Sequence, residues 1–86
     1  MRPLSPKLRR EIENDDFFRK CCIADGCHGR VEIHHAFIIA GRQVNRLWAL
    51  AGVCHHHHEN ISRYQHRVRK ILLSRATEED LSEYPR

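Results

Sequence analysis

Cysteine and histidine are the residues of this chain with the clearest chemistry, and they occur in short clusters. There are four cysteines and eight histidines among 86 residues. Cys22 and Cys27 are separated by four residues, and Cys54 and His57 by two. Two short pairs of this kind, each supplied by one turn, are typical of a tetrahedral structural zinc site. We therefore predict zinc binding by Cys22, Cys27, Cys54 and His57, with Cys21 as the alternative to Cys22.

The histidines outside this set have a second pattern. His34 and His35 are adjacent in a stretch of high β propensity that includes Val31 and Ile33. Neighbouring residues of a strand point to opposite sides, so the two imidazoles cannot easily do the same job. One of them can bind a metal while the other faces a substrate. His58 lies at the start of a predicted helix, where it can meet a strand that packs across that helix.

The charge of the chain is concentrated in its centre. The net charge is +4, but residues 19–75 hold ten Lys or Arg against three acidic residues. A basic centre of this kind suits nucleic acid, and a solvated surface is the alternative explanation. The cations that could contact phosphates are Arg42 and Arg46 in a loop, and Arg63, Arg67 and Lys70 along a helix.

The low apolar content of the chain is a further reason to expect a bound metal that stabilises the fold. Leu, Ile, Val and Phe make up about a quarter of the chain, and domains with so small a core often need a metal or disulfides. No apolar run approaches the roughly 20 residues of a membrane span, and the charged N-terminal stretch lacks a signal peptide's apolar segment. We therefore expect a cytoplasmic protein without membrane association, whose cysteines bind metal in preference to forming disulfides.

These residues must be positioned by a small set of elements, which we expect to form one α+β domain over residues 1–86. We divide it into an N-terminal helix in residues 1–18, a zinc knuckle and core in 19–63, and C-terminal helices in 64–86. Ser5 and Pro6 are typical of a helix start, and Thr77 of another. The expected elements between them are a strand over Val31–His35, a loop or broken helical turn over Ala40–Trp48, a strand over Ala49–Val53 and a helix from His55.

The run CIADGCHGRVEIHHAFIIAGRQVNRLWALAGVCHHHHENI resembles the HNH endonucleases, whose ββα-metal (His-Me) finger is often braced by a zinc knuckle. Within it, HHAFIIAGRQVNRLWAL, together with the later LSRATEED, resembles the RecA-dependent, recombination-associated HNH nucleases of bacteriophages. The resemblance covers roughly residues 17–84. It implies a phage-encoded, metal-dependent DNA endonuclease acting in the bacterial cytoplasm. Its partners would be DNA and a recombination or other DNA-processing protein.

Position by position, the resemblance implies roles for three histidines. His34 and His58 would bind the catalytic divalent metal, Mg²⁺ or Mn²⁺, and His35 would be the general base that activates water. The two cysteine-containing pairs would hold structural zinc.

Two positions depart from the family pattern. The family's central Asn corresponds to Ala49, and Asn45 could substitute from the loop. A further metal ligand often lies four residues beyond the helix histidine, where this chain has Ser62. These departures are the features that support the alternative function, a zinc-stabilised DNA-binding module with a degenerate nuclease site.

Overall fold

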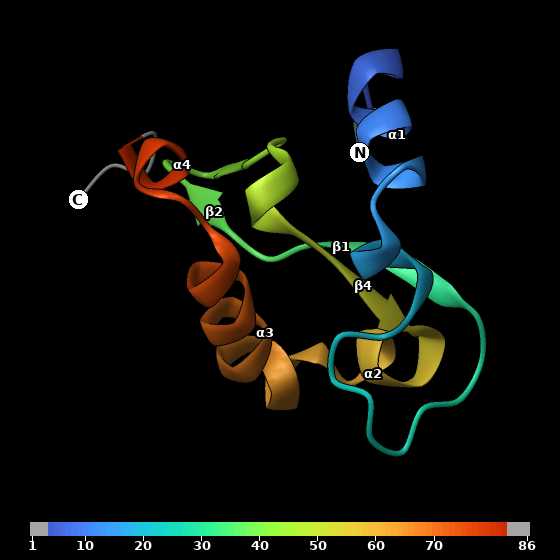
Figure 1. Ribbon diagram of the computed structural model, residues 1–86. Helices are drawn as coiled ribbons and strands as arrows, with labels where there is room; N and C mark the ends of the chain where they lie inside the picture. Colours follow the sequence, from blue (N-terminus) through green and yellow to red (C-terminus); the bar gives the residue numbers. More distant parts are fainter. Residues whose placement is uncertain (1–3, 83–86) are drawn as a thin grey trace.

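A pair of antiparallel strands lies at the centre of the structure, a computed structural model that describes residues 4–82 (Figure 1). Strand β1 (Val31–His35) pairs with β4 (Leu50–Cys54), with Val31 opposite Cys54 and His35 opposite Leu50. β1 has the expected bounds. β4 begins one residue later than expected, because Ala49 closes a 3-10 turn. The ends of the two expected terminal segments, residues 1–3 and 83–86, lie outside the described residues.

β4 is buried along its whole length and is crossed closely by another part of the chain. A Cβ atom at Gly52 would lie 3.2 Å from the carbonyl oxygen of Lys20 and 3.2 Å from Cα of Phe18. The carbonyl of Gly52 also accepts a hydrogen bond of 2.8 Å from the backbone N–H of Cys22. Gly52 therefore allows the segment that carries the first cysteines to lie directly against β4.

The N-terminal elements cover one part of the sheet. Helix α1 (Pro6–Glu13) begins after Ser5, whose Oγ accepts a hydrogen bond of 3.1 Å from the backbone N–H of Leu8, as the sequence predicts. A 3-10 turn, η1 (Asp16–Arg19), follows. Leu8 and Phe18 pack with Leu50 of β4 in a small apolar cluster.

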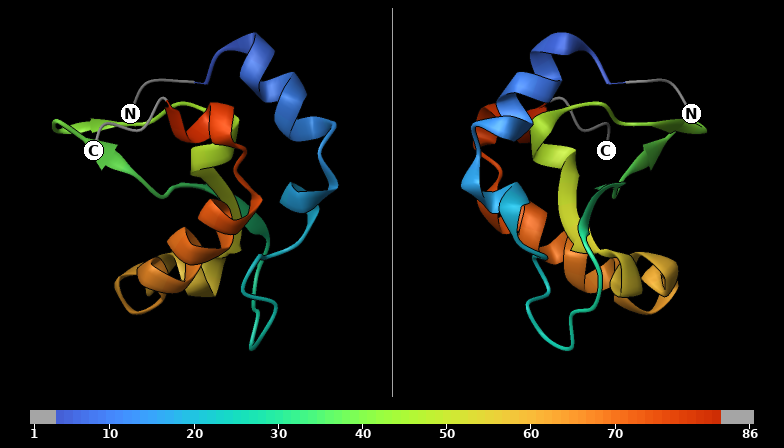
Figure 2. Two further views of the ribbon diagram at one scale, coloured as in Figure 1. Left: turned by 60° about the vertical axis from the view of Figure 1, so that its left-hand side comes forward. Right: turned by 90° about the vertical axis from the view of Figure 1, so that its right-hand side faces the viewer.

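The chain between β1 and β4 forms a hairpin where a loop or broken helical turn was expected. β2 (Ile38–Ile39) pairs with β3 (Arg42–Gln43), and the 3-10 turn η2 (Leu47–Ala49) leads into β4. The two residues between β2 and β3, Ala40 and Gly41, have φ of 53° and 76°. Two positive φ values match a type I′ turn, whose twist suits a tight hairpin. The hairpin projects from the rest of the molecule (Figure 2, green, left view).

The C-terminal half is helical, but it is not one continuous helix from His55. Helix α2 (His55–Glu59) ends at Asn60, and α3 (Ile61–Arg75) begins after it. The side-chain amide of Asn60 donates a hydrogen bond of 2.9 Å to the carbonyl of His56. Side-chain hydrogen bonds of this type compete with the helical ladder, which explains the break.

The last helix, α4 (Glu78–Ser82), begins where it was expected. The Thr77 hydroxyl accepts from the backbone N–H of Asp80, and the Asp80 carboxylate accepts from that of Thr77. This reciprocal pair is a capping box. Within residues 4–82, no helix is long and apolar enough to cross a membrane.

The buried side chain of Leu50 joins β4 to the N-terminal cluster, so its truncation should be costly. We expect Leu50→Ala to lower the free energy of unfolding by about 2–5 kcal/mol, measured by chemical denaturation. Leu73 is 42% exposed and provides the matched control. Leu73→Ala should change the free energy of unfolding by about 0.5 kcal/mol or less. Equal losses in the two variants would contradict this description of the core.

Candidate functional site

Four potential metal ligands converge where the knuckle meets the end of β4. The ligand atoms of Cys21, Cys27, Cys54 and His57 all lie within 4.8 Å of one another. Nδ1 of His57 is 3.3 Å from Sγ of Cys21, 3.9 Å from that of Cys27 and 3.2 Å from that of Cys54. Ligands about 2.0–2.3 Å from a tetrahedral zinc ion are roughly 3–4 Å apart. The four residues could therefore bind a metal such as zinc.

Local structure positions each member of this cluster. Cys54 is the last residue of β4 and the N-cap of α2, and its Sγ accepts from the backbone N–H of His57 at 3.5 Å. His57 follows within the first turn of α2, so its ring lies beside the Cys54 thiol. Cys21 and Cys27 lie on the long connection between η1 and β1. Cys21, Cys54 and His57 are buried, whereas Cys27 is exposed.

The structure corrects one predicted ligand, because Cys21 and not Cys22 belongs to the cluster. The backbone N–H of Cys22 is hydrogen-bonded to the carbonyl of Gly52, which aligns this segment with β4. The half-buried Cys22 side chain packs against the apolar core. The four-residue gap between Cys22 and Cys27 was therefore a misleading signal, since the contact with β4 decides which of two adjacent thiols is a ligand.

The thiols of the cluster have altered acidities. Burial opposes ionisation of Cys21, but backbone hydrogen bonds with Cys54 and Ala24, and the contact with His57, lower its pKa to about 6. Desolvation, followed by the hydrogen bond with Cys21 and then the charge of Cys21, raises the pKa of Cys27 to about 11. Close thiolates repel one another, and a bound cation relieves this repulsion. The electrostatics of the cluster therefore favour a cation.

A second cluster forms between β1 and the helices, around His34. The rings of His34 and His58 have their centroids 5.2 Å apart and meet edge to face. Nε2 of His34 donates a hydrogen bond of 2.8 Å to Oε1 of Gln65 on α3. Burial, ahead of other effects, lowers the pKa of His34 and so disfavours the charged form of its ring. The structure thus brings together the two histidines that were predicted as ligands of a catalytic metal.

Glu32 supports this cluster and was not singled out from the sequence. Its carboxylate accepts hydrogen bonds from Nδ1 of His58 at 2.7 Å and from Nδ1 of His55 at 2.9 Å. The hydrogen bond from His58, and then the one from His55, lower the pKa of Glu32. The bond with Glu32 in turn raises the pKa of His55. The available signal was the two-residue spacing from His34, which places Glu32 on the same side of the strand.

His35 lies on the other side of β1 from His34 and has a different partner. Its Nε2 donates a hydrogen bond of 2.8 Å to Oδ1 of Asn45. Asn45, the loop residue that could substitute for the missing Asn, is therefore in direct contact with His35. Ala49, at the position that the HNH resemblance aligns with an Asn, is fully buried in the core.

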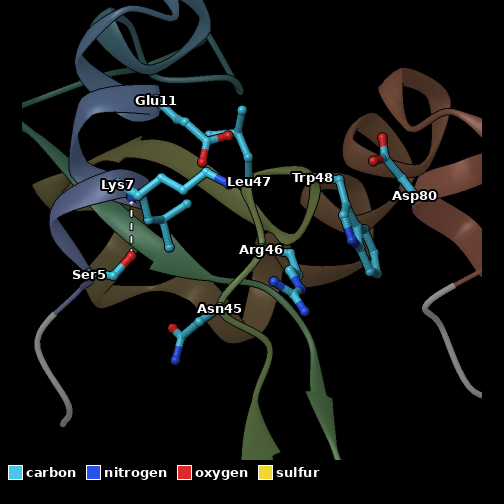
Figure 3. A pocket seen from close by; sticks show the side chains of 9 residues that line it. Ser5, Lys7, Glu11, Asn45, Arg46, Leu47, Trp48 and Asp80 are labelled. Carbon is cyan, nitrogen blue, oxygen red and sulfur yellow. Dashed lines mark hydrogen bonds between the residues drawn. The ribbon is translucent and has the colours of Figure 1, made fainter.

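Asn45 connects His35 to open space at the surface. It lines two cavities, of about 250 Å³ and 340 Å³. Arg46 and Lys7 line the first cavity, where Asn45 and Arg46 lie next to each other on the loop (Figure 3). Arg42 lines the second. The two predicted loop cations, Arg42 and Arg46, therefore each line a cavity that Asn45 also lines.

The predicted helix cations lie elsewhere. At about 100° per residue, Arg63, Arg67 and Lys70 are on the side of α3 roughly opposite Gln65. One guanidinium nitrogen of Arg67 donates at 3.4 Å to the carbonyl of Ile23 in the knuckle. The residue that faces β1 is Arg69, whose Nε donates at 2.7 Å to the carbonyl of Ala36. Arg69 was missed from the sequence, although its spacing of four from Gln65 places both on one helix face.

Comparison of the chain with family models, with curated proteins and with solved structures finds no match.

The choice between two adjacent thiols gives a sharp test of the four-residue cluster. We expect Cys21→Ser to lose bound zinc and much of its folded structure, because metal binding contributes folding free energy here. Cys22→Ser, the matched control, should keep one zinc ion per chain. Metal analysis and circular dichroism of the two purified variants measure these outcomes. Loss of zinc from Cys22→Ser alone would overturn the assignment.

Proposed function

We propose that this protein is a metal-dependent endonuclease of the HNH type that hydrolyses DNA phosphodiester bonds. The observation that carries the proposal is that the adjacent histidines of β1 lie on opposite sides of the strand and have different partners. His34 lies against His58 on one side of the strand, and His35 is held by Asn45 on the other. Phosphodiester hydrolysis needs both a cation and a base near the attacking water, and the two sides of β1 supply one candidate for each.

The residues around His34 fit a divalent cation. Two imidazoles bound to one ion through nitrogen, at about 2.1 Å, have ring centroids roughly 4.5–5.5 Å apart. The observed separation for His34 and His58 is 5.2 Å. Because Nδ1 of His58 donates to Glu32, its Nε2 is the nitrogen left to bind. A carboxylate behind a ligand histidine fixes its tautomer and orientation. When bound, Mg²⁺ or Mn²⁺ would neutralise phosphate charge and stabilise the leaving oxygen.

His35 fits the role of general base. Donation from Nε2 to Asn45 fixes the ring and leaves Nδ1 with a lone pair. In the proposed reaction this nitrogen takes a proton from water as the water oxygen bonds to phosphorus. The bond from phosphorus to the leaving oxygen breaks, and that oxygen is then protonated from solvent. Asn45 acts through His35 and is a positioning residue.

DNA is the partner that the charges favour. Residues 33–58 contain no acidic side chain, and two predicted cations, Arg42 and Arg46, lie on the hairpin and the loop beside Asn45, which contacts His35. Positive groups beside a phosphodiesterase site can hold the backbone on both sides of the scissile bond. The cations on the far side of α3, Arg63, Arg67 and Lys70, would contact flanking DNA.

The different proposed roles of His34, His35 and His58 predict different effects of their variants on DNA cleavage. His35→Ala should keep its zinc and its DNA affinity but cleave at least ~100-fold more slowly, the low end of general acid–base catalysis. His34→Ala and His58→Ala should be partly restored by raised Mn²⁺, whereas His35→Ala should not, because added cation supplies no base. Nicking of supercoiled plasmid with Mg²⁺, Mn²⁺ or chelator is the measurement.

Exposed His66 on α3 provides the control, since His66→Ala should cleave like the wild type. Full activity in His35→Ala would exclude this base. A wild-type protein that binds DNA but never cleaves it with either metal would favour the zinc-stabilised DNA-binding module.

The position of Arg42 predicts its effect on DNA binding. Arg42→Ala should weaken binding and reduce the slope of log affinity against log salt by about 0.9, the value for one lost phosphate contact on duplex DNA. Arg10 is an exposed arginine on α1, and Arg10→Ala should leave the slope unchanged. Fluorescence anisotropy with a short duplex at several salt concentrations measures both. Identical slopes for wild type and Arg42→Ala would remove the hairpin from the interface.

A further inference from the structure

We propose that Gln65 is a third ligand of the divalent metal, bound through its side-chain oxygen. This inference rests on the proposed function, in which His34 and His58 hold the same ion. No fixed spacing in the sequence identifies Gln65 as a ligand. Ser62, the position where HNH nucleases often have a further ligand, is exposed on α3.

The distance between Gln65 and His34 carries the inference. Oε1 of Gln65 lies 2.8 Å from Nε2 of His34. Two ligand atoms at about 2.1 Å from one octahedral ion, at right angles, are roughly 3 Å apart. The same two atoms satisfy each other as donor and acceptor, and at this separation both could instead turn their lone pairs to an ion between them. His34 then carries its proton on Nδ1, a change of tautomer that needs no movement of the backbone.

The backbone around Gln65 holds it in this position. The break at Asn60 separates α2 from α3, so the direction of Gln65 is not fixed by the helical register of His58. One turn beyond Gln65, the Nε of Arg69 donates at 2.7 Å to the carbonyl of Ala36, directly after β1. This bond ties the same face of α3 to the end of the strand that carries His34. Gln65 is itself half-buried, which limits its rotamers.

The chemistry of an amide oxygen suits the proposed ion. Mg²⁺ and Mn²⁺ prefer oxygen ligands, and two imidazoles alone favour later transition metals. A neutral amide adds an oxygen without cancelling the charge of the ion, so the full attraction for a phosphate remains. We therefore expect Gln65 to set both the affinity and the selectivity of the site.

The test uses the full chain with its zinc retained and measures Mn²⁺ binding from the electron paramagnetic resonance signal of the free ion. Gln65→Ala should weaken Mn²⁺ binding at least ~10-fold, the low end for loss of a metal-site interaction. Gln65→Glu should tighten it. Gln65→His should shift selectivity from Mn²⁺ towards Ni²⁺. A residue that only accepts a hydrogen bond from His34 would give no such gain for Ni²⁺.

Gln43 in the exposed hairpin is the matched control, and Gln43→Ala should bind Mn²⁺ like the wild type. Equal Mn²⁺ affinity in Gln65→Ala and wild type would overturn the ligand role while leaving the two-histidine site intact. Absence of Mn²⁺ binding by the wild type would overturn this inference together with the metal site of the proposed function. Mn²⁺ binding as expected without any DNA cleavage would uphold Gln65 and contradict only the nuclease activity.

Discussion

The structure depends on the convergence of three cysteines and one histidine around the end of β4. The cluster joins the knuckle to the strand and to the first turn of α2. The start of the long connection before β1 is also held by the buried side chain of Ile23 and by the backbone hydrogen bond from Cys22 to Gly52. Residues 24–30 are exposed, so this part of the connection depends most on the cluster. An ion at this point would replace much of the cohesion that a larger core supplies.

The position of β4 then determines which side chains of β1 face each side of the strand pair. Antiparallel pairing sets which residues of β1 lie opposite buried residues of β4. The two-residue period of a strand sends His34 and His35 to different environments, one among helix residues and one beside the loop. Two adjacent imidazoles thus acquire different partners, Gln65 for one and Asn45 for the other. The candidate chemistry follows from strand geometry more than from any single contact.

Features governed by local interactions were predictable from the sequence. The Ser5 and Thr77 caps and the strand Val31–His35 appear as expected, because capping and β propensity depend on neighbouring residues. Three of the four cluster ligands were also predicted. The choice between Cys21 and Cys22 was not, because it depends on a hydrogen bond to a glycine thirty positions away in the sequence. The break at Asn60 and the hairpin turn arise from local contacts that hydrophobic periodicity does not encode. The strand period places Glu32 on the side of His34, but its bonds to His55 and His58 join residues 23 and 26 positions apart.

The shortness of α2 couples its two neighbouring histidines. His57 and His58 are consecutive in a helix of five residues, and they face different clusters. Because the two residues share one short stretch of backbone, a displacement of this turn that moved one ring would also move the other. The spacing between the cysteine-containing cluster and the His34–His58 pair is therefore set by the backbone of one helical turn.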